Sequence, residues 1–166
     1  MLSFIFPTAD MERLALDFRQ EFFDNGESEV HGDGALYLAE SYSAWLEKIN
    51  LDLTRDDVPA ATYFAFSGDK IVGSVQIRYR LDAYFSVYGG HIGFSVRPSE
   101  RRKGYAGEIL AWALAHCRAR GLKKVMVTCE KDNIASARTI EKNGGVLESE
   151  IWHPDGVYLQ RRWITL

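Results

Sequence analysis

The segment from Gly104 to Arg120 limits the fold more than any other part of the sequence, because apolar residues occupy nearly every side of the helix that it predicts. Other elements must cover such a helix on most sides. Its apolar stretch is much shorter than the roughly 20 residues that cross a bilayer, and it contains His116. We therefore expect a buried helix in a soluble protein rather than a membrane segment.

Hydrophobic periodicity predicts the elements around this helix. Helices are predicted at 11–22, 38–49, 104–120 and 132–143, and strands at 2–6, 62–66, 71–81, 91–96, 125–129, 146–152 and 157–165. Turn residues indicate hairpins at 67–70 and 153–156. The order β α α β β β α β α β β predicts an α/β (α+β) fold in which helices flank a mixed sheet.

Length and composition predict one globular domain, residues 1–166. Hydrophobic residues make up 46% of the chain, which excludes a disordered or low-complexity protein. The start of the sequence lacks the basic segment and cleavage site of a signal peptide, so we expect a cytoplasmic location. Cys117 and Cys129 form no CxxC motif and are too few for a zinc site, so reduced thiols and no metal are expected.

Charge is distributed unevenly along the chain. Residues 1–60 contain 13 acidic and 4 basic residues, a net charge of -9, whereas residues 61–166 contain 10 acidic and 16 basic residues, a net charge of +6. The total of -3 argues against a dedicated nucleic-acid binder, which is usually basic. The stretch 101–124, whose only acidic residue is Glu108, is nevertheless expected to attract an anion.

The segment from Val96 to Gly107 is the most informative motif. It leaves a predicted strand, passes through three consecutive basic residues and enters a helix at small residues. Helix N-termini present unpaired N–H groups and a positive dipole, so this turn is suited to a phosphate or pyrophosphate. Gly104 and Ala106 would let the phosphates approach the backbone closely. The sequence has neither a P-loop nor the G-x-G-x-x-G of a dinucleotide fold.

Two blocks resemble the GCN5-related N-acetyltransferase family. The first, Arg101-Arg102-Lys103-Gly104-Tyr105-Ala106, resembles the acetyl-CoA signature R/Q-x-x-G-x-G/A of that family. The second, from Asn133 to Gly144, resembles its N-x-x-A-x-x-L-Y-x-K-x-G helix, and the order of elements agrees along nearly the whole chain. The run from Gly90 to Gly145 is similar to a bacterial subgroup known only as predicted acetyltransferases.

The resemblance implies a splayed central sheet, with acetyl-CoA between the strand that ends at Val96 and the strand that ends at Cys129. Strand 94–96 would offer backbone groups to the pantetheine arm, and residues 101–106 would hold the pyrophosphate. The implied cofactor-binding residues are Phe94, Ser95, Val96, Arg101, Arg102, Lys103, Gly104, Tyr105, Ala106, Asn133 and Ser136. A solvated basic turn at 101–103 and helix capping by Asn133 are the alternative interpretations.

The usual catalytic groups of that family are missing. Its frequent tyrosine aligns with Ile140, and the acidic residue that some members place on the preceding strand aligns with Thr128. His91 and Glu130 are the titratable residues considered instead as general bases, because an amine with a pKa of about 10.4 must lose a proton before it attacks. A structural histidine and a surface carboxylate are the respective alternatives.

The expected function is transfer of an acetyl group from acetyl-CoA to a primary amine, by direct attack while both substrates are bound. The acceptor is a small-molecule or peptide amine, and the acidic N-terminal half favours a cationic one. A homodimer is an open expectation, because dimers are common in the family. The alternatives are a CoA-binding or regulatory module without catalysis and, disfavoured by the overall acidity, a nucleic-acid-binding domain.

Overall fold

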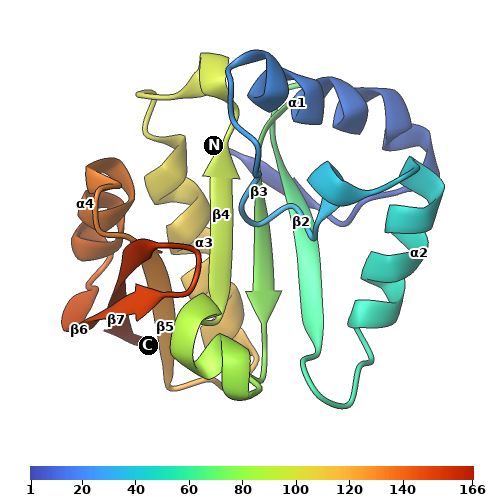
Figure 1. Ribbon diagram of the computed structural model, residues 1–166. Helices are drawn as coiled ribbons and strands as arrows, with labels where there is room; N and C mark the ends of the chain where they lie inside the picture. The colour runs from blue at the N-terminus through green and yellow to red at the C-terminus, as the bar shows by residue number, and fades with distance from the viewer.

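The strands form two antiparallel sheets in the computed structural model, which describes residues 1–166 (Figure 1). The large sheet has the order β1-β2-β3-β4, with β1 at Ser3–Ile5, β2 at Ala60–Ser67, β3 at Lys70–Arg78 and β4 at Ile92–Val96. The small sheet has the order β5-β7-β6, with β5 at Lys124–Glu130, β6 at Val146–His153 and β7 at Val157–Thr165. The predicted fold class and element order are confirmed, and the expected splay divides the central sheet in two.

Four helices cover these sheets: α1 at Glu12–Asp24, α2 at Tyr42–Asp52, α3 at Tyr105–Ala119 and α4 at Ile134–Lys142. Phe18 of α1 and Trp45 of α2 share a core with Phe64 of β2, on one face of the large sheet. Ile109 and Leu110 of α3 lie in the other core, which faces β2 to β5. The predicted burial of α3 is confirmed only in part. Its buried residues are Ile109, Leu110, Ala113, Leu114 and Cys117, whereas Ala111, Ala115 and Arg118 leave another side of the helix exposed. No helix of the chain is long and apolar enough to cross a membrane.

A local signal explains the largest difference between the predicted and observed helix bounds. The second helix starts at Tyr42 instead of residue 38, because the Ser41 side chain caps it by accepting the Ala44 N–H at 3.2 Å, and the preceding Leu36–Leu38 is a 3-10 turn. The sequence predicts either Asp132 or Asn133 as the N-cap of α4, and the structure shows Asn133, which accepts the Ser136 N–H at 3.1 Å. Further 3-10 turns occur at Ala9–Met11 and Pro98–Glu100.

A single π-helical turn, Phe85–Gly89, precedes β4 and was not predicted. Its sequence has no helical periodicity, and its position depends on contacts with a strand distant in sequence. The Thr128 hydroxyl of β5 donates to the Tyr88 carbonyl at 2.8 Å. This bond holds the turn against β5.

The two sheets touch at one junction. The His91 N–H donates to the Met126 carbonyl at 2.7 Å, and the Met126 N–H donates to Nδ1 of His91 at 2.9 Å. Gly90 and Val127 form an isolated bridge beside these bonds. Beyond this junction β4 pairs only with β3, and β5 pairs only with β7. The edge of β4 that faces the small sheet therefore stays open.

The loop between α1 and α2 lies directly on β4. A Cβ atom added to Gly32 would come within 2.3 Å of the Gly93 carbonyl oxygen, so only glycine permits this approach. Gly32 also has a φ of +75°, which is unfavourable for other residues. This contact holds the middle of the loop over the middle of β4.

Replacing Gly32 with alanine should lower the free energy of unfolding by about 1 to 2 kcal/mol from backbone strain and a further 1 to 3 kcal/mol, roughly, from the clash with β4. Gly26 is a matched control, because it has a φ of +77° and open space around its missing Cβ. Urea unfolding of Gly32→Ala and Gly26→Ala separates the two effects. Equal losses would mean that the loop is not seated on β4.

Candidate functional site

The N-terminus of α3 is uncapped and open. Gly104 is its N-cap residue, with a φ of +86°, and no side chain caps the helix. The Glu108 N–H makes a bond to the Gly104 carbonyl, so the N–H groups of residues 105–107 precede the first helical hydrogen bond. A Cβ added to Gly104 would meet nothing within 4 Å. A phosphate fits this turn, which combines free N–H groups with an open approach.

The three basic residues before Gly104 are not equivalent. Arg101 pairs with Glu27 at 2.8 Å and donates from Nε to the Val96 carbonyl at 3.2 Å, and Lys103 pairs with Glu100 at 2.7 Å. Arg102 is exposed, has a φ of +64° and forms no ion pair within the chain. Of the three predicted phosphate-binding side chains, only Arg102 presents a charge without a carboxylate partner.

Glu21 of α1 ties this loop to the N-terminal half of the chain. Its carboxylate accepts the Ser99 N–H at 2.7 Å and a bond from Nε of Arg97. Burial alone would raise the pKa of Glu21, but the hydrogen bonds from Ser99 and Arg97 outweigh it and lower the pKa to about 2. The carboxylate is therefore charged throughout the physiological pH range, and its bonds to Ser99 and Arg97 continue to hold the loop.

The predicted residues of β4 divide between its two faces. Phe94 and Val96 pack into the core that contains α3. Ser95 lies on the opposite face, where its hydroxyl is 3.0 Å from the hydroxyl of Ser74. The backbone N–H and C=O groups of Phe94 and Val96 point to the open edge of β4, whereas those of Ser95 point to β3, because alternate residues of an antiparallel strand bond to the neighbouring strand. An extended chain could add to this edge by backbone hydrogen bonds.

The second sequence block forms the far side of the opening between the sheets. Asn133 and Ser136 lie in the first turn of α4, directly after β5, where Asn133 is exposed and Ser136 is half-buried. Ile140 is fully buried in the core beside α3. The side chain at this position therefore packs inside the protein and does not line the opening between the sheets.

His91 lies at the junction of the sheets with its basic nitrogen engaged. A neutral imidazole has one acceptor nitrogen, and Nδ1 of His91 uses it to accept the Met126 N–H. Burial lowers the pKa of His91, and the Met126 bond only partly opposes this effect. The ring is therefore neutral near pH 7, carries its proton on Nε2, and fits the structural interpretation better than the catalytic one.

Glu130 lies at the end of β5, and its side chain is exposed. Residues two apart on a strand share a face, so Glu130 shares a face with Thr128, which contacts the π-helical turn before β4. Val127 and Cys129 point the other way, into the core with α3 and α4. Glu130 is thus on the face of β5 opposite the core that contains α3 and α4.

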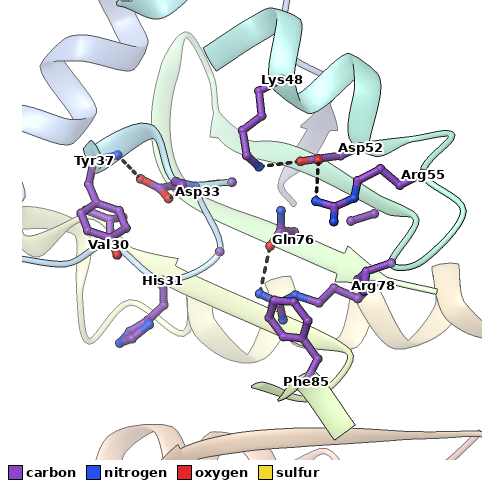
Figure 2. A pocket seen from close by; sticks show the side chains of 15 residues that line it. Val30, His31, Asp33, Tyr37, Lys48, Asp52, Arg55, Gln76, Arg78 and Phe85 are labelled. Carbon is purple, nitrogen blue, oxygen red and sulfur yellow. Dashed lines mark hydrogen bonds and ion pairs between the residues drawn. The ribbon is translucent and has the colours of Figure 1, made fainter. Parts of the chain in front are cut away.

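Sequence reasoning missed a cavity of about 280 Å³ on the face of the large sheet opposite α3 (Figure 2). The loop between α1 and α2, the C-terminal half of α2, β3 and Phe85 line it. Its charged lining residues are Asp33, Lys48, Asp52, Arg55 and Arg78. One signal was available: Ser74, Gln76 and Arg78 alternate with apolar residues in β3, which gives this strand a polar face under the loop.

Asp33 is the most perturbed carboxyl group in the cavity. It is only 1% exposed, and its oxygens accept the N–H groups of Ala35 and Tyr37 at 2.8 and 2.9 Å. Burial raises the pKa of Asp33 to about 7, even though these hydrogen bonds favour the charged form. The Asp33 carbonyl accepts Nε1 of Trp45 at 2.9 Å, which fixes the loop over the cavity.

The comparisons with known proteins agree on one family. The sequence model of the Acetyltransferase (GNAT) family matches residues 16–145. An uncharacterised N-acetyltransferase, YjdG of Bacillus subtilis (strain 168), is 35% identical over 77 residues, which are 44% of this chain and 40% of that protein. The chain therefore matches less than half the length of this curated relative.

Solved structures share the fold at low sequence identity. RimL, a ribosomal L7/L12 alpha-N-protein acetyltransferase in complex with coenzyme A, superposes with a TM-score of 0.77 at 15% identity, covering 99% of this chain and 94% of that one. The microcin C7 self-immunity acetyltransferase MccE, in complex with acetyl-CoA and AMP, gives 0.73 at 17% identity, with coverage of 99% and 92%. A Streptococcus pneumoniae acetyltransferase of the GNAT family gives 0.71 at 17% identity over the whole of both chains.

The raised pKa of Asp33 makes stability depend on pH. Between the ordinary carboxyl pKa of about 3.9 and the folded value, the unfolded chain loses this proton while the folded protein keeps it. Native stability therefore falls as pH rises through this window, by up to about 1.4 kcal/mol per pH unit from this group. Asp33→Asn lacks the titration, so its unfolding free energy minus that of the wild type should rise from about pH 4 to pH 7 and then level off. Urea unfolding of both proteins across this range measures the difference, and a difference that falls with pH would contradict the raised pKa.

Proposed function

The chain belongs to the GNAT family of acetyltransferases, and we propose that it transfers the acetyl group of acetyl-CoA to a primary amine while both substrates are bound. The observation that carries this proposal is the uncapped N-terminus of α3 beside the open edge of β4. This pairing suits a ligand with a pyrophosphate followed by an extended arm. RimL and MccE, which share the fold, were solved with coenzyme A and acetyl-CoA respectively.

The residues present fit acetyl-CoA as follows. The free N–H groups at the start of α3 and the side chain of Arg102 would hold the pyrophosphate. The open edge of β4 at 94–96 would bind the pantetheine arm through backbone groups. Asn133 and Ser136 would contact the arm from the first turn of α4. Arg101 and Lys103 would act mainly by shaping the loop, because both already hold carboxylates.

The reaction needs few catalytic side chains. The amine nitrogen attacks the thioester carbonyl carbon, a C–N bond forms, the C–S bond breaks, and CoA leaves as a thiolate that takes up a proton. Backbone N–H groups on the open edge of β4 would polarise the carbonyl oxygen. The leaving thiol has a pKa of roughly 8.5, judged by cysteine, so a dedicated acid contributes little. Placing the two reactants together supplies most of the rate.

Neither cysteine is suited to carrying the acetyl group. Cys117 is fully buried, and burial raises the pKa of its thiol to about 11. Burial also raises the pKa of Cys129. The thiolate is the nucleophilic form, so both side chains are unreactive near neutral pH. Direct attack by the amine is therefore the better mechanism.

The proton of the amine goes to Glu130, directly or through water, in the mechanism that we favour. Glu130 is exposed at the end of β5, whereas the acceptor nitrogen of His91 is already occupied by the Met126 N–H. A carboxylate has no bound proton to lose first and can accept one at neutral pH.

Cofactor binding should depend on Gly104. In Gly104→Glu the new carboxylate would project toward the pyrophosphate, and affinity for acetyl-CoA should fall about 100-fold, because like charges roughly 6 Å apart near a surface repel by about 3 kcal/mol. Gly121→Glu is the matched control: Gly121 follows the other end of α3, with a φ of +87° and the same open surroundings. Calorimetric titration should show near-normal affinity for the control. Equal affinities of the two variants for acetyl-CoA would show that the pyrophosphate does not bind at the start of α3.

The two candidate bases can be separated with any amine that the protein acetylates. Glu130→Gln should lower kcat/KM roughly 100-fold near neutral pH with unchanged acetyl-CoA affinity, and the deficit should shrink as the pH approaches the amine pKa of about 10.4. His91→Gln should change kcat/KM by only a few-fold once the folded fraction is taken into account. The opposite pattern would make His91 the base. Near-normal rates for both variants would mean that the amine loses its proton to bulk water.

A further inference from the structure

The charges that line the cavity under the loop between α1 and α2 are unevenly matched (Figure 2). Lys48 pairs with Asp52 at 2.6 Å, and Arg55 lies 3.7 Å from Asp52 and 2.7 Å from Asp57. Arg78 pairs with no carboxylate in the chain. The cavity therefore has one cation without an internal counter-ion.

Neutral groups hold the Arg78 guanidinium in place. Nη1 donates to the Gly90 carbonyl at 3.1 Å, Nη2 donates to Oε1 of Gln76 at 3.0 Å, and the guanidinium carbon lies 4.1 Å from the centre of the Phe85 ring. These contacts engage two of its five N–H groups and leave three. Burial lowers the pKa of Arg78 to about 10, so the side chain still carries its charge at neutral pH.

An unpaired cation in a partly desolvated site lowers the free energy of unfolding, and a ligand of opposite charge that binds there relieves this cost. A planar guanidinium with free N–H groups, already fixed in orientation, is suited to a carboxylate, which can accept two parallel hydrogen bonds. One uncompensated positive charge matches the single charge of a carboxylate better than the two charges of a phosphate monoester. The volume of about 280 Å³ lies near the lower limit for small-molecule sites, which favours a compact ligand.

The cavity is next to the proposed site of transfer. Gly32, one of its lining residues, rests on Gly93 of β4, and His31, another, accepts a bond from Ser74, whose hydroxyl contacts Ser95. A ligand in the cavity would thus lie beside the strand whose open edge is assigned to the pantetheine arm. Of the 13 acidic residues in 1–60, only Asp33 and Asp52 line this space, so the acidity of that half does not determine the charge of the cavity.

We propose that this cavity is the acceptor site and that Arg78 binds a carboxylate of the acceptor, so that the substrate is a small amino acid-like amine. This inference rests on the proposed acetyltransferase function and specifies its substrate class. Arg78 acts here as a residue that determines specificity, and it takes no part in the movement of protons or of the acetyl group.

The proposal is tested by comparing how fast the wild-type protein acetylates acceptors that differ in their charged group. CoA thiol release from acetyl-CoA is measured with the standard free amino acids, with their C-terminal amides, with phosphoethanolamine and with spermidine. At least one amino acid should have a kcat/KM about 100-fold or more above that of its amide, because a site built for a charged group rejects an analogue without it. Equal use of acids and amides, or turnover only of phosphoethanolamine, spermidine or amides, would overturn the carboxylate assignment and leave the acetyltransferase function standing.

Variants of Arg78 and Arg80 then test which residue recognises the carboxylate, with the amino acid that gives the highest kcat/KM as substrate. Arg78→Gln should raise KM about 100-fold and remove most of the preference for acid over amide, whereas Arg80→Gln, an exposed neighbour beyond the end of β3, should keep both values. Arg78→Lys retains the charge and should lose less. Acetyl-CoA affinity should be normal in all three, and a preference for the acid that survives Arg78→Gln would place its recognition elsewhere. Failure of the wild type to bind acetyl-CoA or release CoA with any amine would instead remove the proposed function itself.

Discussion

The junction between the two sheets determines where β4 and β5 separate. His91 and Met126 exchange two hydrogen bonds there, one through the backbone of His91 and one through its ring. The ring nitrogen of His91 accepts one of these bonds in place of a backbone carbonyl, so the backbone pairing between β4 and β5 does not continue past this residue. β4 and β5 separate immediately beyond it, and the backbone of β4 keeps an unpaired edge. An unpaired strand edge can pair with another extended chain, and the neighbours of this one are the start of α3 and the first turn of α4, which is why we propose it as the binding surface for the cofactor arm.

Glu21 and Glu27 explain why net charge along a sequence is a poor guide to the charge of a site. Both belong to the acidic N-terminal half, yet both hold arginines of the basic loop before α3, namely Arg97 and Arg101. Opposite charges that were separated by more than seventy residues in the sequence neutralise each other at this contact. Arg102 in the loop before α3 and Arg78 in the cavity form no ion pair. These two positions, rather than the sums of charge, describe the electrostatics that a ligand would meet there.

The sequence was informative where the signals are local. The N-cap of α4 and the glycine turns at residues 68 and 156 depend on neighbours a few positions away, and each was predicted correctly. The burial of α3 was predicted only in part, because the packing of distant strands and of α4 decides which sides of the helix are covered. The π-helical turn at Phe85–Gly89, the cavity and the raised pKa of Asp33 were not predicted, because each depends on how distant segments pack. The alternation in β3 revealed a polar face, but the loop that covers this face and the turn that supplies Phe85 beside Arg78 come from elsewhere in the chain.

The strand order of the small sheet has a consequence for the order in which the protein can fold during synthesis. β5 forms one side of the opening, yet its only strand partner in that sheet is β7, which follows both α4 and β6 in the sequence. A ribosome can complete the large sheet and α3 while β5 still lacks a partner, so half of the opening can be built early on the nascent chain. The other half waits until residues 157–165 have emerged and inserted between β5 and β6.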